Sequence, residues 1–147
     1  MPDPRPKTKV LFVCTGNACR SQMAEGWTRA RWGDRIEVHS AGVMPCGVSS
    51  LSAQVMKEAG VDISKHTSKH VRDVLHIPFD FVITVCGYAD QRCPTFPGGG
   101  KRIHRPFDDP PTVSSTARSE EEELAIYRRI RDEIRAYVET LPKVLGL

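Results

Sequence analysis

The segment VLFVCTGNACRSQMAEG, residues Val10–Gly26, decides how the fold is read. It begins with apolar, β-branched residues typical of a strand buried on both faces, and it ends in a pattern typical of a helix. Between them lies a turn of small residues that starts at Cys14 and ends at Arg20 and Ser21. A strand that enters a helix through such a turn is the first unit of an alternating α/β fold.

Outside this segment, strand-like and helix-like stretches continue to alternate. Strands are predicted over Lys9–Cys14, Arg35–Ser40, Phe79–Cys86 and Lys101–Arg105, and helices over Ser21–Arg31, Leu51–Ala59, Ser68–Leu75 and from Ser119 to Leu141. Such alternation implies an α/β fold with a doubly wound, four-stranded parallel sheet and helices on both faces. We expect residues 9–147 to form a single catalytic domain. Residues 1–8, which are rich in proline, are expected to form a flexible N-terminal arm.

Composition narrows the class of protein. The 147 residues suit one domain, and the net charge of +3, without a dense basic run, argues against a nucleic-acid partner. We find neither a signal peptide nor an apolar run long enough to span a bilayer, and we therefore expect a cytoplasmic protein with no membrane contact. The sequence leaves the oligomeric state open, and a monomer is our preferred expectation. Five cysteines cannot all pair within one chain, which favours catalytic thiols over structural disulfides.

The small residues that follow Cys14 predict an oxyanion-binding loop. They allow backbone N–H groups to converge on one tetrahedral anion, and they are Thr15, Gly16, Asn17, Ala18 and Cys19. Arg20 adds a planar guanidinium that can bind two oxyanion oxygens at once. The same donors are expected to lower the pKa of Cys14 and make its thiolate a nucleophile, with Ser21 donating a hydrogen bond to the sulfur.

A second segment, CGYADQR from Cys86 to Arg92, has the same spacing and also follows a predicted strand. We do not expect it to bind an anion. Asp90 would bring a carboxylate against the anion, Tyr88 is bulky, and Cys93 stands where the first loop has a serine. The spacing of cysteine and arginine is therefore weak information by itself.

CTGNACRS followed by QMAEG closely resembles the low-molecular-weight protein tyrosine phosphatase superfamily, over nearly the whole chain. The resemblance implies that Cys14 attacks a bound oxyanion and that Arg20 binds it. It further implies that an aspartate before a proline is the general acid. The sequence Asp-Asp-Pro-Pro offers Asp109 for this role, with Asp108 as the alternative.

Further motifs resemble one branch, the thioredoxin-coupled arsenate reductases: QMAEGW, HSAG, IHRPFDDP and VITVCGYADQRCP. That resemblance implies that Cys14 attacks arsenate, with phosphate or sulfate as competing anions. Cys86 would then attack Cys14 and release arsenite, and Cys93 would attack Cys86 to leave a Cys86–Cys93 disulfide for thioredoxin to reduce. We expect the segment 87–100, with three consecutive glycines near its end, to be a mobile loop.

Some reductases of this branch bind potassium near the loop, through residues that match Asn17, Glu25, Ser40 and Thr67 and through an aspartate. Here Lys69 occurs where the aspartate is expected. We therefore expect the Lys69 ammonium to replace the cation and to pair with Glu25. We expect neither a resident metal nor an organic cofactor.

The predicted function is reduction of arsenate to arsenite, with weak phosphatase activity as a side reaction. The alternatives are a low-molecular-weight tyrosine phosphatase and a sensor that binds an oxyanion or oxidises without turnover. The reductant can be thioredoxin, glutaredoxin or mycothiol. Cys46 has no role in the family pattern and is interpreted as a small loop residue.

Overall fold

The structure is a computed structural model that describes residues 6–96 and 99–147. Its single parallel sheet has the strand order β2-β1-β3-β4, formed by β1 (Thr8–Cys14), β2 (Ile36–Gly42), β3 (Phe81–Thr84) and β4 (Lys101–His104). The helices are α1 (Arg20–Trp32), α2 (Ser50–Glu58), the 3₁₀ turn η1 (Val71–Val74), α3 (Gly87–Arg92), α4 (Pro110–Val113), α5 (Glu120–Glu139) and α6 (Leu141–Leu145). The predicted four-stranded parallel sheet is confirmed.

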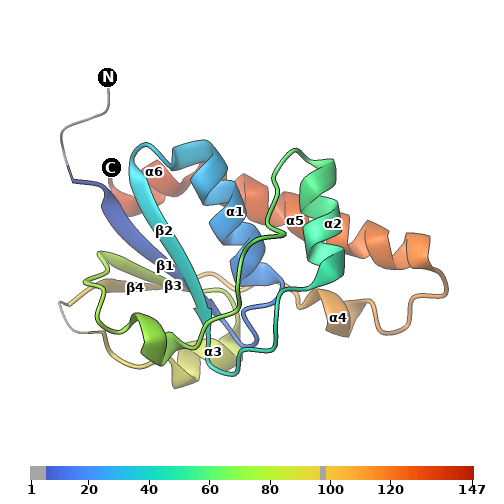
Figure 1. Ribbon diagram of the computed structural model, residues 1–147, viewed down its shortest axis with the longest axis horizontal. Coiled ribbons are helices and arrows are strands. Elements are labelled where there is room, and N and C mark those ends of the chain that lie inside the picture. Colours follow the sequence, from blue (N-terminus) through green and yellow to red (C-terminus); the bar gives the residue numbers. More distant parts are fainter. Residues whose placement is uncertain (1–5, 97–98) are drawn as a thin grey trace.

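The strand order makes the sheet doubly wound. The chain moves from β1 to β2 in one direction, and later places β3 and β4 on the opposite side of β1. Right-handed crossovers then put α1 on one face and η1 and α3 on the other. Figure 1 shows α1, α2 and α5 lying together, with α3 near the end of β2 where its arrow points. Ligands of such sheets bind at the carboxyl ends of the strands where the winding reverses, here beside β1 and β3.

The central strand β1 explains why the sheet is stable. Val10, Leu11, Phe12 and Val13 are completely buried, as expected of a strand that is covered on both faces. Helix α1 packs on this strand, and its Gly26 lies against α2 and the segment that follows α2, where there is no room for a side chain. A Cβ at Gly26 would lie 2.7 Å from the side chain of Ile63.

The last long helix begins as predicted and ends earlier. The Ser119 hydroxyl accepts the N–H of Glu122, while the Glu122 carboxylate accepts the N–H of Arg118. The predicted single helix to Leu141 is wrong at its end, because α5 stops at Glu139 and a new short helix, α6, begins at Leu141 with Pro142 in its first turn. Across the described residues, no helix is both long and apolar enough to cross a membrane.

Three other predicted segments differ from the structure. The helix expected over Ser68–Leu75 is only a 3₁₀ turn, capped by His70. The segment expected to be a mobile loop instead begins with helix α3, because Cys86 caps its first turn; residues 97 and 98 of that segment lie outside the described residues. Of the predicted N-terminal arm, residues 1–5 also lie outside them, and Thr8 already belongs to β1.

Candidate active site

The loop from Cys14 to Arg20 joins the carboxyl end of β1 to α1, and its path depends on two residues. Asn17 is fully buried and has a φ of 48°, in the left-handed region that few side chains adopt. Gly42, at the end of β2, lies directly against the loop. A Cβ at Gly42 would lie 2.7 Å from the carbonyl oxygen of Thr15 and 2.8 Å from the nitrogen of Asn17. The loop can therefore pack on β2 only because residue 42 is glycine.

Cys14 lies buried at the base of this loop, and its sulfur is 2.8 Å from the hydroxyl of Ser21. Burial raises the pKa of the Cys14 thiol, while the Ser21 hydroxyl and backbone and the charge of Arg20 lower it. Because desolvation is the largest of these effects, the expected lowering of the Cys14 pKa is wrong. Ser21 and Arg20 nevertheless act in the predicted direction.

A chain of hydrogen bonds behind the loop fixes which way Ser21 points its proton. The backbone N–H of Lys69 donates to Asn17 Oδ1 at 2.9 Å, so the Asn17 Nδ2 group faces the other way. It donates to Ser21 Oγ at 2.8 Å and to Ser40 Oγ at 2.9 Å. Since Ser21 accepts from Asn17, its own proton is left to be donated to the sulfur of Cys14.

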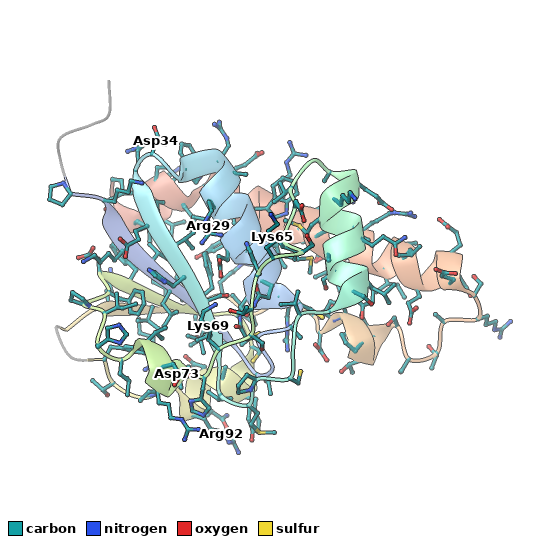
Figure 2. The ribbon with its side chains drawn as sticks, viewed as in Figure 1. Arg29, Asp34, Lys65, Lys69, Asp73 and Arg92 are labelled. Atoms are coloured by element: carbon teal, nitrogen blue, oxygen red, sulfur yellow. The ribbon has the colours of Figure 1, made fainter. Side chains whose placement is uncertain are left out.

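This chain of hydrogen bonds ends in an ion pair between the buried Glu25 and the half-exposed Arg29. Ser40 donates to Glu25 Oε1 at 2.5 Å, and Glu25 Oε2 pairs with Arg29 at 2.8 Å. The predicted pairing of Lys69 with Glu25 is wrong, since the Lys69 ammonium donates to the carbonyl of Thr67 at 3.0 Å. Arg29 lies one turn after Glu25 on α1, so the two side chains share one face of the helix. Figure 2 shows Arg29 beside α1 and Lys69 nearer the end of β2.

His66 and Gln22 connect the same ion pair to the loop, and sequence analysis missed both. Arg29 has only donors, so it donates to His66 Nε2 at 3.0 Å; His66 Nδ1 then donates to Gln22 Oε1 at 2.9 Å. Burial lowers the pKa of His66, which agrees with this neutral form of the ring. The Gln22 amide donates to the carbonyls of Asn17 and Thr67, each at 3.1 Å. The one sequence signal was that Gln22 lies within the quoted QMAEG motif.

The structure separates the two candidate acids. Asp109 Oδ1 is 3.3 Å from the Arg20 guanidinium, whereas Asp108 pairs with Arg129 at 3.4 Å on the exposed surface. The Thr112 hydroxyl donates to the other oxygen of Asp109 at 2.6 Å. Of the two carboxylates, Asp109 is therefore the one that reaches the loop.

A cavity of about 360 Å³ opens above the loop. Its lining combines the loop with two facing segments and consists of Cys14, Thr15, Gly16, Ala18, Cys19, Arg20, Met44, Cys46, Asp109 and Pro111. Cys19 is buried, and burial raises the pKa of its thiol, whereas Cys46 is exposed. The predicted nucleophile, guanidinium and acid therefore share one cavity. This cavity can hold a tetrahedral oxyanion.

Cys86 lies beside the loop, at the end of the neighbouring strand. Its sulfur is 3.2 Å from the hydroxyl of Thr15 and accepts the N–H of Ala89 at 3.3 Å. Thr15, expected as an anion ligand, thus also contacts a second thiol. Cys93 lies at the far end of α3, where burial raises the pKa of its thiol and the charge of Arg102 lowers it. The structure therefore brings Cys86, and not Cys93, next to the nucleophile loop.

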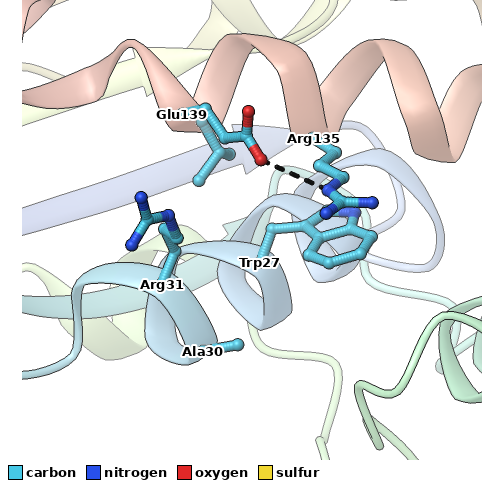
Figure 3. Close-up of a pocket in the computed structure, with 6 residues that line it drawn as sticks. Trp27, Ala30, Arg31, Arg135 and Glu139 are labelled. Carbon is cyan, nitrogen blue, oxygen red and sulfur yellow. Dashed lines mark hydrogen bonds and ion pairs between the residues drawn. The ribbon is translucent and has the colours of Figure 1, made fainter.

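A smaller cavity of about 140 Å³ lies between α1 and α5 (Figure 3). The Arg135 guanidinium lies 5.0 Å from the centre of the Trp27 ring and pairs with Glu139 at 3.3 Å. The other residues that line this smaller cavity are Ala30, Arg31 and Val138. This lining contains neither a nucleophile nor part of the loop, so we assign the chemistry to the cavity above the loop.

Comparison with known proteins agrees with this geometry. Residues 9–146 match the family described as low molecular weight phosphotyrosine protein phosphatase. An arsenate reductase of Halalkalibacterium halodurans is 44% identical over 134 residues, which cover 91% of this chain and 94% of the relative. A solved arsenate reductase in the oxidized state has a TM-score of 0.77 at 29% identity, covering 94% of this chain and 98% of its own. A thioredoxin-dependent arsenate reductase of Corynebacterium glutamicum has a TM-score of 0.71 at 29% identity, covering 98% of this chain and 64% of its own. The chain therefore belongs to the low molecular weight phosphotyrosine protein phosphatase family.

Proposed function

We propose that the protein reduces arsenate to arsenite and that thioredoxin regenerates its thiols. Relatives that are more than 40% identical to this chain are named arsenate reductase, and one structural neighbour is named thioredoxin-dependent. The observation that carries the proposal is the 3.2 Å contact between Thr15 and Cys86. It supports a second thiol at the nucleophile loop, which reduction requires and hydrolysis does not.

Binding would use the loop as an anion site. Arsenate has the shape and charge of phosphate, and the N–H groups that follow Cys14 can surround its oxygens. The Arg20 guanidinium contacts Asp109 and donates to the carbonyl of Phe107 at 3.1 Å. Arg20 would exchange part of these contacts for two arsenate oxygens. Phosphate and sulfate would compete for the same donors.

The first chemical step would be attack of the Cys14 thiolate on arsenic. A sulfur–arsenic bond forms and an arsenic–oxygen bond breaks, while Asp109 gives a proton to the departing oxygen so that it leaves as water. Ser21 donates a hydrogen bond to the Cys14 sulfur, for which the Asn17 amide supplies the orientation. These side chains would also allow hydrolysis of a phosphate ester.

The second step would transfer two electrons. Cys86 attacks the Cys14 sulfur, a disulfide bond forms, the sulfur–arsenic bond breaks, and its electron pair remains on arsenic, which leaves as arsenite. The thiolate of Cys93 then attacks Cys86 and releases Cys14 as a thiolate. The dithiol of thioredoxin finally reduces the Cys86–Cys93 disulfide and is itself oxidised, so that the two electrons taken up by arsenic come from thioredoxin.

We further propose that Arg29 supplies internally the positive charge that a bound potassium ion would supply beside Glu25. The 2.8 Å pair between Glu25 and Arg29 supports this, and Arg29 takes the role that Lys69 was expected to have. An internal cation would keep Ser40 and Asn17 oriented without a bound ion. Activity would then be the same in potassium and sodium salts.

The test is a coupled assay with arsenate, thioredoxin, thioredoxin reductase and NADPH, run beside a glutaredoxin system. We expect arsenate to drive NADPH oxidation with the thioredoxin system. Cys93→Ser should block repeated turnover but allow one cycle of arsenite release. Failure of arsenate to drive NADPH oxidation in the unmodified chain would overturn the proposal.

A phosphatase is the second candidate, because Cys14, Arg20 and Asp109 share one cavity and suffice for ester hydrolysis. Hydrolysis uses neither Cys86 nor Cys93. If aryl phosphate hydrolysis is the main activity, Cys86→Ser and Cys93→Ser will leave turnover unchanged. A sensor, in contrast, would bind the oxyanion or oxidise without turning over.

A further inference from the structure

Helix α3 keeps two of the cysteines apart. Cys86 is its N-cap and Cys93 its C-cap, so the helix occupies the whole stretch between them. Seven positions of helix separate their Cα atoms by about 10 Å. A disulfide requires Cα atoms within roughly 7 Å of each other. Cys86 and Cys93 therefore cannot form a disulfide while α3 remains helical.

The C-terminal end of α3 is tied to the sheet by a single arginine. Arg102, on β4, donates from Nη2 to the carbonyl of Cys93 at 3.1 Å and to that of Pro94 at 2.7 Å. Its Nη1 donates to the carbonyl of Asp90 at 3.5 Å. Carbonyls at a helix end lack partners within the helix, and Arg102 supplies them. Arg102 itself is fixed by the pairing of β4 with Val82 of β3.

A second tie holds the middle of the helix. The Thr84 hydroxyl donates to Asp90 Oδ1 at 2.8 Å and lies 2.9 Å from His104 Nδ1. One tie therefore comes from Arg102 of β4 and the other from Thr84 at the end of β3, and both act on the half of α3 nearer Cys93. The other end of the helix lies against the nucleophile loop through Thr15 and Cys86. A movement of Cys86 toward Cys14 can thus begin without breaking either tie.

We propose that Arg102 is a positioning residue that clamps the Cys93 end of α3 to β4, so that the Cys86–Cys93 disulfide forms only when this clamp opens. The inference rests on the proposed reductase function, because only there do these two cysteines have to pair. The clamp stabilises the dithiol form of the resting protein. It also orders the cascade, since Cys86 can move before Cys93 does.

Arg102 has a second effect on Cys93. Its charge lowers the pKa of the Cys93 thiol, against the rise that burial causes, and Asp90 acts in the same direction as burial. The same guanidinium therefore holds the Cys93 backbone and favours its thiolate. Replacing Arg102 would both release α3 and make Cys93 harder to ionise, and these two effects can be measured separately.

The first measurement is the equilibrium between the Cys86–Cys93 dithiol and disulfide in buffers of reduced and oxidised glutathione. One oxidised glutathione takes up the two electrons and yields two reduced ones. The full chain with Cys14→Ser is used, so that Cys86 cannot pair with Cys14. Because hydrogen bonds from a charged donor are the strong ones, we expect Arg102→Gln to shift the equilibrium toward the disulfide by about tenfold.

Two variants serve as matched comparisons. Arg102→Lys keeps the charge but cannot bridge three carbonyls, so its shift should lie between the unmodified chain and Arg102→Gln. Lys101→Gln removes an exposed charge from the neighbouring position of β4 and should leave the equilibrium unchanged. If Arg102→Lys behaves like the unmodified residue, or if Lys101→Gln shifts the equilibrium as far as Arg102→Gln, the clamp is wrong.

Hydrogen–deuterium exchange supplies a readout that does not depend on thiol chemistry. The amides of α3 should exchange faster in Arg102→Gln, while those of α5 keep their rate and report that the domain is still folded. If the amides of α3 exchange at the same rate in Arg102→Gln and in the unmodified chain, the proposed clamp is wrong, and the proposed cascade is unaffected. Failure of the unmodified pair to form a disulfide in any glutathione buffer would overturn the cascade and the clamp with it.

Discussion

Two segments of this chain share the same spacing of cysteine and arginine, and they fold differently. Cys14–Arg20 follows β1 and forms a loop whose arginine reaches Asp109 at 3.3 Å across the cavity. Cys86–Arg92 follows β3 and forms α3, where the guanidinium of Arg92 lies 3.7 Å from the centre of the Tyr88 ring. The spacing alone therefore does not specify an anion site.

The difference originates in the residues between the cysteine and the arginine, and in the residues that pack against them. The first segment needs the left-handed Asn17 and the close approach of Gly42 on β2. In the second segment, Cys86 caps a helix that buries Ala89 completely. Small residues with a glycine beside them favour a loop lined by N–H groups, whereas ordinary helix formers behind a cap favour a helix.

The largest expected effect is the difference in activity between a variant that lacks Arg20 and one that lacks Arg92. Arg20→Ala should lower kcat/KM for arsenate by about a thousandfold, because it removes the charged donor that faces the anion. Arg92→Ala, at the same spacing after the other cysteine, should leave kcat/KM within about threefold. Steady-state kinetics of both variants checks this. Similar losses of kcat/KM in the two variants would contradict the conclusion that only the first segment binds the anion.

Glycine-to-alanine changes give the next largest effect. Gly42→Ala forces a Cβ to 2.7 Å from the Thr15 carbonyl, and the resulting shift of the loop should weaken phosphate binding and lower activity by about a hundredfold. Gly87→Ala, at the start of α3, meets open space and should leave phosphate affinity unchanged.

Calorimetric titration with phosphate measures both glycine variants. Thermal unfolding, recorded in parallel, should show Gly42→Ala destabilised by about 1–3 kcal/mol and Gly87→Ala as stable as the unmodified chain or more so, by up to about 1 kcal/mol. Undiminished phosphate affinity in Gly42→Ala would contradict the tight packing of loop and strand.

A smaller effect is expected on the pH dependence of thiol alkylation, which should distinguish Cys14 from Cys93. Burial raises the pKa of Cys14 and Ser21 opposes it, so Ser21→Ala should raise this pKa further. Because the thiolate is the reactive form, alkylation of Cys14 rises with pH through its pKa, and the variant's profile should move to higher pH. Iodoacetamide labelling followed by mass spectrometry gives the rates. The profile of Cys93, which depends on burial, Arg102 and Asp90, should stay in place; a joint shift of both would count against a local role of Ser21.

The smallest effect concerns salt. The polar network behind the first loop ends in the Glu25–Arg29 pair, so activity in potassium chloride and sodium chloride at equal ionic strength should agree within experimental error. Arg29→Gln removes the internal cation and should make the rate sensitive to the choice of cation, by about twofold. A clear preference of the unmodified chain for potassium would show that Glu25 still binds an ion.

Features that depend on strand order can be predicted from the sequence, whereas features that depend on partners from distant elements cannot. Cys14 and Cys86 each end a predicted strand, and parallel strands bring both to one edge of the sheet, as found. The resemblance favours Asp109 over Asp108, and the structure agrees, but the pairing that holds Asp108 away from the loop involves Arg129, a residue of α5 that no local pattern connects to either aspartate. Tertiary contact decides such choices.

Three further errors have physical causes. Lys69 is the expected partner of Glu25 because it occurs where the family pattern has an aspartate of the cation site. Arg29, however, lies four residues from Glu25 on the same helix, a spacing visible in the sequence. Helix α3 is too short to show an apolar period, so its sequence resembles that of a loop. The donors around Cys14 predict a lowered pKa, whereas burial, which the sequence does not report, is the larger effect.

The contact between Thr15 and Cys86 also bears on how such an enzyme can be built. In the proposed mechanism, the loop after β1 binds the anion and the segment after β3 delivers the electrons. Thr15 of the first and Cys86 of the second are in contact but lie 71 positions apart in the chain. The two functions are therefore encoded in separate parts of the sequence. On this mechanism, a hydrolase with the same loop would become a reductase if the short segment after its adjacent strand were replaced by the one that follows β3 here. Enzymes for phosphate-ester cleavage and for oxyanion reduction would then differ in one short segment and share the same fold.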